Sequence, residues 1–175
     1  MKKDFILPII ILSVICLLVS GLLAAVNNIT KPVIENTANK RTEIEKKGIL
    51  PLADEFILIK HEDLPRTIKE VYKTSNNIGY IFMISVRGYG RNDLKILCGI
   101  DNDGRIIKAA VLEHSETISF FNRVFDENHA GKFWGKNINE IEEIDSVTGA
   151  TITSNALKTA MRDSLTAYEI ITGRF

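Results

Sequence analysis

The sequence lacks an excess of charge of either sign, and it contains few cysteines. Its 175 residues include 22 Lys plus Arg and 22 Asp plus Glu, so the formal net charge is zero. A nucleic-acid-binding domain normally gathers a basic excess on one face, so no nucleic-acid partner is expected. The 2 cysteines are too few for a disulfide scaffold or a four-cysteine zinc site. With 45% hydrophobic residues, the chain is also too apolar for an acidic disordered tail.

Short motifs of the common catalytic and metal centres are also missing. The sequence contains no P-loop, no Cys-x-x-Cys and no Ser–His–Asp pattern. Its histidines, His61, His114 and His129, have no neighbouring cluster of metal ligands in the sequence. We therefore predict neither a catalytic residue nor a metal site.

Charge is entirely absent from one long apolar run, Phe5–Val26. Of its 22 residues, 18 are apolar. A helix of that length spans about 33 Å, enough to cross a hydrocarbon core of about 30 Å. A cleaved signal peptide is the alternative, because Lys2 and Lys3 precede the run and small residues follow Leu23. The run is longer than the usual apolar core of a signal peptide, which favours a retained anchor over residues 5–26.

The charges beside this run do not settle its orientation. The two lysines before it favour a cytoplasmic N-terminus over residues 1–4. Lys31, Lys40 and Arg41 carry positive charge on the other flank. The sequence thus indicates one membrane anchor followed by one globular domain, with the side of the membrane left open by charge alone.

Residues 27–50 have the polar composition of a juxtamembrane segment. Thr30-Lys31-Pro32 predicts a break after the anchor, because the residue before a proline is biased away from helix. Val33–Lys47 is rich in charge and ends at Gly48, which is typical of a helix on the surface. We interpret the segment as a juxtamembrane helix or stalk, with a solvated linker as the alternative.

Residues 51–175 have the pattern of one α+β domain, in which an antiparallel β-meander packs with helices. Asp103-Gly104 supplies a tight turn between the last two strands. Apolar residues from Asn155 to Ile171 recur at helical spacing, and Gly173 follows them. Strands are expected at Glu55–Ile59, Ile68–Tyr72, Gly79–Val86, Leu94–Ile100 and Arg105–Leu112, and further helices at Ile118–Phe125 and Ile138–Ile144.

The most informative stretch, Asp145–Ser154, directly precedes the last helix. It reads Asp-Ser-Val-Thr-Gly-Ala-Thr-Ile-Thr-Ser and is rich in small and hydroxyl-bearing residues. A helix N-terminus has free backbone N–H groups and a positive dipole end, which together suit a phosphate. Threonine and serine are also good N-caps, so a plain capped turn is the alternative.

The same stretch resembles the flavinylation motif of the FMN-binding domain family. That domain is found in the G subunit of the Rnf ion-translocating oxidoreductase and in the C subunit of the sodium-pumping quinone reductase. In this family the threonine that ends Thr-Gly-Ala-Thr carries FMN through a phosphoester bond, and Thr151 stands at that position. The resemblance implies that the rest of the motif also binds the flavin, namely Asp145, Thr148, Gly149, Ala150, Thr153 and Ser154.

The resemblance extends over nearly the whole chain. His114-Ser115-Glu116-Thr117 matches a His-x-Glu-Thr segment of the family that resembles part of the flavin pocket. The resemblance therefore places His114, Glu116 and Thr117 beside the flavin, although such a histidine alone would indicate only a hydrogen-bonded surface residue. Other matching segments are Asn28–Pro32, Leu50-Pro51 before Phe56, Val71–Lys73, Gly79-Tyr80, Gly88–Gly90, the Asp-Gly turn and Phe133–Lys136.

One segment departs from the family pattern. The family continues with Pro-Gly-Leu-Gly after His-x-Glu-Thr, whereas Ile118-Ser119-Phe120-Phe121 follows here. A bulkier apolar segment thus replaces a tight loop. Phe120, Phe121 and Trp134 are candidates for stacking on the flavin ring, with burial in the core as the alternative for each.

The resemblance implies a membrane-anchored flavoprotein that relays electrons through FMN on Thr151. It would be the redox subunit of a translocase rather than a complete enzyme, and the Rnf G subunit is the preferred assignment. The single-pass anchor would place the domain on the extracytoplasmic side, where the family's flavin transferase attaches FMN from FAD. The expected partners are other membrane subunits of an electron-transport complex, the flavin transferase and membrane lipid.

Two alternatives stay open. The chain could be a stand-alone membrane-anchored FMN protein, which a gene without neighbouring complex subunits would favour. It could also be a non-redox anchored binding or assembly protein, in which Thr151 serves only as an N-cap.

Overall fold

The computed structural model describes residues 2–173, with side chains from residue 6 onward. Met1 of the expected cytoplasmic N-terminus lies outside the described residues. The chain divides into two compact units, Met1–Arg41 and Thr42–Phe175. The second unit thus begins within the segment that was expected to form a stalk.

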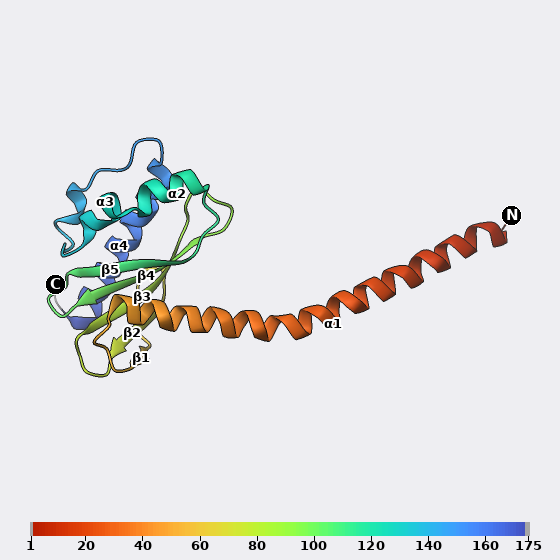
Figure 1. Cartoon of the computed structure of the whole chain (residues 1–175), viewed down its shortest axis with the longest axis horizontal. Helices are drawn as coiled ribbons and strands as arrows, with labels where there is room; N and C mark the ends of the chain where they lie inside the picture. The colour runs from red at the N-terminus through yellow and green to blue at the C-terminus, as the bar shows by residue number, and fades with distance from the viewer. Residues whose placement is uncertain (1, 174–175) are drawn as a thin grey trace. The chain divides into compact units, whose positions relative to one another are not determined.

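The first helix, α1, runs from Lys2 to Ile49 (Figure 1). Its apolar part has a mean hydropathy of 3.0 and no buried residues, and its length and composition suit a membrane crossing. The predicted break at Thr30–Pro32 is wrong, because the helix continues through Pro32. A proline removes one backbone hydrogen bond, and helical residues on both sides can carry the chain past that loss.

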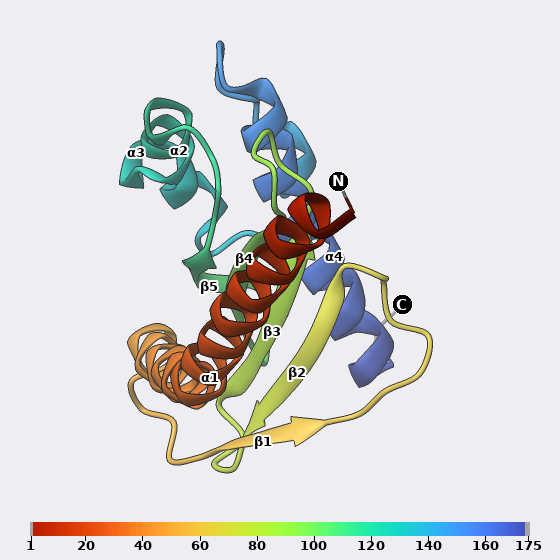
Figure 2. The same cartoon turned by 90° about the vertical axis from the view of Figure 1, so that its right-hand side faces the viewer.

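Five strands form one antiparallel sheet in chain order (Figure 2). Each strand follows its neighbour through a short connection or loop, so the predicted meander is confirmed together with the α+β class. The central pairing is regular from Gly79↔Asp101 to Val86↔Leu94. The strands are β1 (Phe56–Ile59), β2 (Ile68–Thr74), β3 (Gly79–Val86), β4 (Leu94–Asp101) and β5 (Ile106–Glu113).

One face of the sheet packs against helix α4, Thr151–Thr172, which Gly173 ends as predicted. Helix α2, Ile118–Phe125, was also predicted and contributes Val124 to the same core. Three short helices complete this layer: α3 (Glu127–Ala130), η1 (Gly131–Phe133) and η2 (Ile141–Glu143). The helix expected at Ile138–Ile144 was predicted too long, because only the short helix η2, Ile141–Glu143, forms there. Its first turn is replaced by a local turn, since Asn137 Oδ1 accepts hydrogen bonds from the N–H groups of residues 139 and 140.

The other face of the sheet is covered by the C-terminal end of α1, within the second compact unit. Ile49 is buried and lies over Gly99 in β4, where an added Cβ would overlap its Cγ2. Lys46 is also buried, with its ammonium 3.2 Å from the Tyr72 ring centroid and 2.8 Å from Glu43 Oε1. A buried ammonium needs such partners to offset its lost hydration. The C-terminal end of α1 therefore has the side chains required to pack against the sheet.

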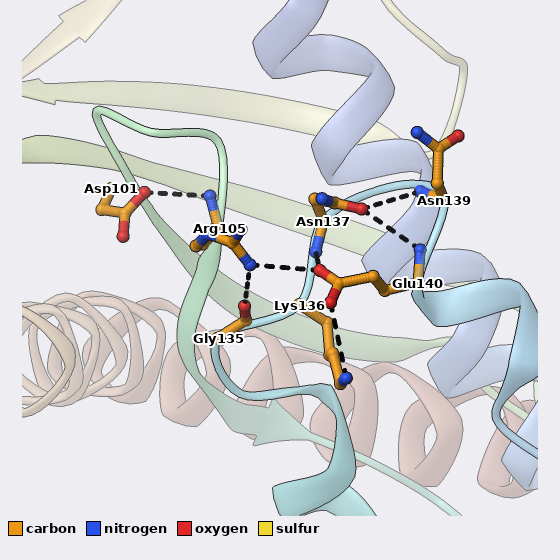
Figure 3. Close-up of polar contacts among 7 residues, drawn as sticks. All are labelled: Asp101, Arg105, Gly135, Lys136, Asn137, Asn139 and Glu140. Carbon is orange, nitrogen blue, oxygen red and sulfur yellow. Dashed lines mark hydrogen bonds and ion pairs between the residues drawn. The ribbon is translucent and has the colours of Figure 1, made fainter.

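A polar network fixes the β4–β5 turn to the segment that leads toward α4 (Figure 3). Arg105 Nη1 donates to the Gly135 carbonyl at 2.7 Å and to Glu140 Oε2 at 3.1 Å. The same Glu140 oxygen accepts from the Asn137 N–H at 3.1 Å, and Lys136 lies 3.5 Å from the other oxygen. The Asn137 N–H, followed by the charges of Lys136 and Arg105, stabilises the ionised carboxylate of Glu140. The pKa of Glu140 therefore lies below its ordinary value. The network holds the chain in place before the Asp145–Ser154 stretch.

Candidate functional site

In the Asp145–Ser154 stretch, residues 145–150 form a loop and turn, and residues 151–154 form the first turn of α4. Gly149 has a φ of 78°, a left-handed conformation that side chains disfavour. Ala150 occupies the N-cap position, and no side chain caps the helix there. Thr151 is the first helical residue and its side chain is exposed. The alternative in which Thr151 is an N-cap is therefore wrong, and its hydroxyl is accessible to chemistry.

A groove of about 240 Å³ lies beside Thr151. Two aromatic residues from other parts of the chain form one wall, with the Tyr89 and Phe120 ring centroids 5.3 Å apart in an edge-to-face arrangement. Tyr89 and Ile152 are 56% and 55% exposed, so apolar surface faces the solvent at this point. The lining consists of Tyr89, Phe120 and residues 149–153.

Glu116 connects the walls of this groove. Its buried carboxylate accepts a hydrogen bond from the Gly90 N–H at 2.8 Å through Oε1. Through Oε2 it accepts a hydrogen bond from the hydroxyl of Thr153, which is also buried. The predicted residues Glu116 and Thr153 are thus brought together and bonded to each other, and of the two only Thr153 lines the groove.

The other residues of the His-x-Glu-Thr segment point elsewhere. The exposed His114 ring stacks on Phe121, with centroids 3.8 Å apart and planes 8° from parallel. Thr117 is exposed at the N-cap of α2, and its carbonyl accepts a hydrogen bond from the Phe120 N–H at 2.9 Å. Neither His114 nor Thr117 lines the groove, so the segment does not act as one unit.

The departure from the family pattern forms the first turn of α2. Of the three aromatic candidates for stacking, Phe120 lines the groove. Phe121 instead packs between His114 and Phe125, and Trp134 is partly buried against the main core. The bulkier segment therefore adds an aromatic wall at the point where the family has a tight loop.

Ser154 has a partner that the sequence did not reveal. Its hydroxyl oxygen lies 3.1 Å from His129 Nε2, and it accepts a hydrogen bond from the Val147 N–H at 3.2 Å. His129 is buried in α3, and this burial, together with Lys132, lowers the pKa of its imidazole. These residues lie far apart in the sequence, so no local spacing could have indicated the pair.

The remaining motif residues lie at the edge of the site. Asp145 and Thr148 are exposed and do not line the groove, whereas Gly149 and Ala150 do. The guanidinium of Arg123 in α2 faces Gly149: its Nη1 lies 3.2 Å from where a Cβ on that glycine would be. Arg123 was not predicted, since a single arginine in an apolar helix gives no sequence signal.

Comparison with known proteins finds a known domain in this part of the chain. Residues 88–166, which span Tyr89, Glu116, Phe120 and the start of α4, match the FMN-binding domain. The G subunit of the proton-translocating ferredoxin:NAD(+) oxidoreductase complex of Clostridium ljungdahlii is 23% identical over 171 residues, covering 93% of this chain and 90% of the relative. The G subunit of the Na(+)-translocating ferredoxin:NAD(+) oxidoreductase complex of Acetobacterium woodii is 24% identical over 185 residues, covering 91% and 89%. The expected resemblance to the FMN-binding domain family is therefore confirmed, with the family model matching residues 88–166 and both relatives covering most of the chain.

Proposed function

We propose that the chain is the G subunit of an Rnf-type complex, a membrane-anchored protein that transfers electrons through FMN bound covalently to Thr151. The observation that carries this proposal is the exposed Thr151 hydroxyl at the first position of α4, beside an apolar groove within the matched FMN-binding domain. A residue that served only to start the helix would have no need of such a groove.

The residues present fit a phosphate and a flavin ring. The first turn of α4 has no side-chain cap, so its backbone N–H groups are available to phosphate oxygens at the positive end of the helix dipole. The missing Cβ of Gly149 leaves open space in front of the Arg123 guanidinium. Tyr89, Phe120 and Ile152 supply apolar surface for a planar ring.

The proposed attachment transfers the FMN part of FAD to Thr151. The hydroxyl oxygen of Thr151 becomes bonded to the FMN phosphorus, the pyrophosphate bond breaks, AMP leaves and the hydroxyl proton passes to solvent. FMN then supplies the electron-carrying chemistry, while the protein supplies position and surroundings. The covalent bond keeps the cofactor with a domain that faces outward from the cell.

The anchor and the relatives support a place in a membrane complex. The apolar part of α1 is consistent with the proposed anchor over residues 5–26, and the proposed FMN-binding domain over residues 51–175 follows the stalk. The relatives are subunits of ferredoxin:NAD(+) oxidoreductase complexes, which supports other membrane subunits as partners. We place the domain on the extracytoplasmic side, with a flavin transferase as the maturation partner and lipid around the single anchor.

The attachment is tested by co-expressing the full chain with a flavin transferase and examining the denatured band for ultraviolet fluorescence. Wild type is expected to fluoresce, and its intact mass should rise by the mass of FMN less one water. Thr151→Ala should lose the flavin yet fold, because a change at the start of a helix costs at most about 2 kcal/mol.

Thr159→Ala, on the same helix but away from the groove, is the matched control and should keep the flavin. Asp145→Ala should lower the extent of flavinylation without unfolding the domain. A wild type without bound flavin, or a Thr151→Ala variant that keeps it, would contradict the covalent assignment.

A further inference from the structure

The C-terminal end of α2 meets the N-terminal end of α4 at one contact. Arg123 stands in the last turn of α2, and its Nη1 faces the backbone of Gly149. A Cβ at residue 149 would lie 3.2 Å from this nitrogen, closer than comfortable packing allows. The absence of a side chain on Gly149 therefore lets a cationic group approach the turn that precedes Thr151.

The N–H donors of the Arg123 guanidinium are available to a ligand. Among the domain's other arginines, Arg87 pairs with Asp93, Arg105 with Glu140 and Arg162 with Glu142, whereas no ion pair joins Arg66 or Arg91 to a carboxylate within residues 6–173. Within residues 6–173, no ion pair or hydrogen bond joins Arg123 to another side chain. Its charge favours the C-terminal end of the α2 dipole, but that interaction leaves all its N–H donors available.

The groups beside Thr151 that are free to bind an anion are N–H donors and one cation, because the Glu116 carboxylate is already bonded to the Gly90 N–H and the Thr153 hydroxyl. The first turn of α4 presents uncapped N–H groups, and Arg123 adds a full positive charge beside Gly149. The groove wall formed by Tyr89, Phe120 and Ile152 is apolar and carries no charge. An anionic group bonded to Thr151 would thus find its counter-charge at Arg123, while an apolar ring would extend along the groove.

We propose that Arg123 is a positioning residue that binds the phosphate of FMN attached to Thr151. The inference rests on the proposed function and adds to it the residue that neutralises the phosphate. A phosphodiester keeps one negative charge on two free oxygens, and a guanidinium can donate to both at once. Arg123 would hold these oxygens from α2, and the N–H groups in the first turn of α4 would hold them from the other helix.

The test uses the full chain in detergent, matured by a flavin transferase with FAD as the flavin donor. Arg123→Gln is expected to lower the initial rate of FMN incorporation about tenfold, since a charge-assisted hydrogen bond is lost. Arg123→Lys should be intermediate, because it keeps the charge but loses the two-pronged geometry. Arg66→Gln, an exposed arginine in the loop before β2, is the control and should behave as wild type.

A second readout separates phosphate binding from a structural role. The thermal midpoint is measured for each variant before and after flavinylation. If Arg123 binds the phosphate, Arg123→Gln lowers the apo midpoint only slightly, through the lost interaction with the α2 dipole, and also reduces the rise that flavinylation produces. Added salt should also slow incorporation into wild type more than into Arg123→Gln.

The outcomes distinguish this inference from the proposed function. Covalent flavin on Arg123→Gln at the wild-type rate, with a wild-type rise in midpoint, would overturn the role of Arg123 and leave the Thr151 attachment intact. An apo midpoint that falls while the rise is unchanged would assign Arg123 to the α2 dipole alone. Absence of flavin from wild type would overturn both proposals.

Discussion

The hydroxyl of Thr153 donates a hydrogen bond to the Glu116 carboxylate, and both side chains are buried. The other oxygen of Glu116 accepts from the Gly90 N–H at 2.8 Å. Glu116 thus joins the segment that carries Tyr89, the start of α2 and the first turn of α4. Since these three segments line the groove, one carboxylate sets where Thr151 lies relative to the aromatic wall.

Glu116→Ala should destabilise the domain and slow flavin incorporation. It leaves the Gly90 N–H and the Thr153 hydroxyl buried without a partner, at a cost of about 1–3 kcal/mol for each such group. Glu116→Gln should keep most of the stability, because its amide oxygen can accept from Gly90 and its NH₂ can donate to Thr153. The thermal midpoint of the detergent-solubilised chain and the rate of flavinylation measure the two effects.

Glu113→Ala provides the matched control for this prediction. Glu113 is exposed and pairs with Lys95 at 2.9 Å, and such a surface pair contributes at most about 1 kcal/mol. If Glu116→Ala melted and incorporated flavin like Glu113→Ala, the carboxylate would not hold the groove together.

The elements that could be predicted from the sequence are those with a local signal. The β3 strand, Gly79–Val86, has the predicted bounds because its apolar run is bounded by turn residues. The Asp103-Gly104 turn follows from the positive φ that glycine accepts, here 76°. The helix expected at Asn155–Ile171 lies within α4, although α4 begins four residues earlier, at Thr151.

The parts that could not be predicted depend on contacts between distant segments. The Glu116–Thr153 and His129–Ser154 pairs join residues with no common periodicity, and Tyr89 reaches the groove only because the sheet and α2 fold together. Residues 27–50 were expected to form a juxtamembrane helix or stalk, and their charge gives no sign that the end of α1 packs on the sheet, since lysines are rarely buried. Lys46 is buried nevertheless, since aromatic rings and Glu43 accept its charge.

Gly99→Ala should destabilise the domain through a clash with Ile49. An added Cβ would overlap Ile49 Cγ2, and overpacking a close-fitting core costs about 1–3 kcal/mol. Ile49→Ala should itself cost about 2–5 kcal/mol, because it leaves a cavity between α1 and the sheet. The distance from the added Cβ to the Ile49 Cβ is 3.7 Å, an ordinary contact.

The double variant is therefore expected to be more stable than the sum of the two single effects predicts. In the Ile49→Ala background, Gly99→Ala meets no Cγ2 and partly fills the cavity, so its cost should fall or change sign. Thermal midpoints of the four proteins in detergent give the coupling. Strict additivity would show that α1 does not pack on β4 through Ile49.

His129→Gln should change how stability depends on pH. The pKa of His129 in the folded protein lies below its ordinary value, because burial and Lys132 disfavour the charged ring, with Asp126 acting in the opposite direction. The unfolded chain therefore binds a proton near pH 6.5 that the folded chain does not, and stability decreases as the pH falls below about 6.5. The Ser154 hydroxyl also favours the neutral imidazole. Its oxygen accepts a hydrogen bond from the Val147 N–H, so its O–H can donate to the unprotonated Nε2 of His129.

The expected result is a thermal midpoint that falls less between pH 7.5 and pH 5.5 in His129→Gln than in wild type. Glutamine can still bond to Ser154 but does not titrate, so the proton-linked loss disappears while the contact at the start of α4 remains. His61→Gln, which replaces an exposed histidine, should keep the wild-type pH dependence. An equal fall of the thermal midpoint in wild type and His129→Gln would contradict this prediction. It would mean that the fold does not hold the His129 imidazole neutral.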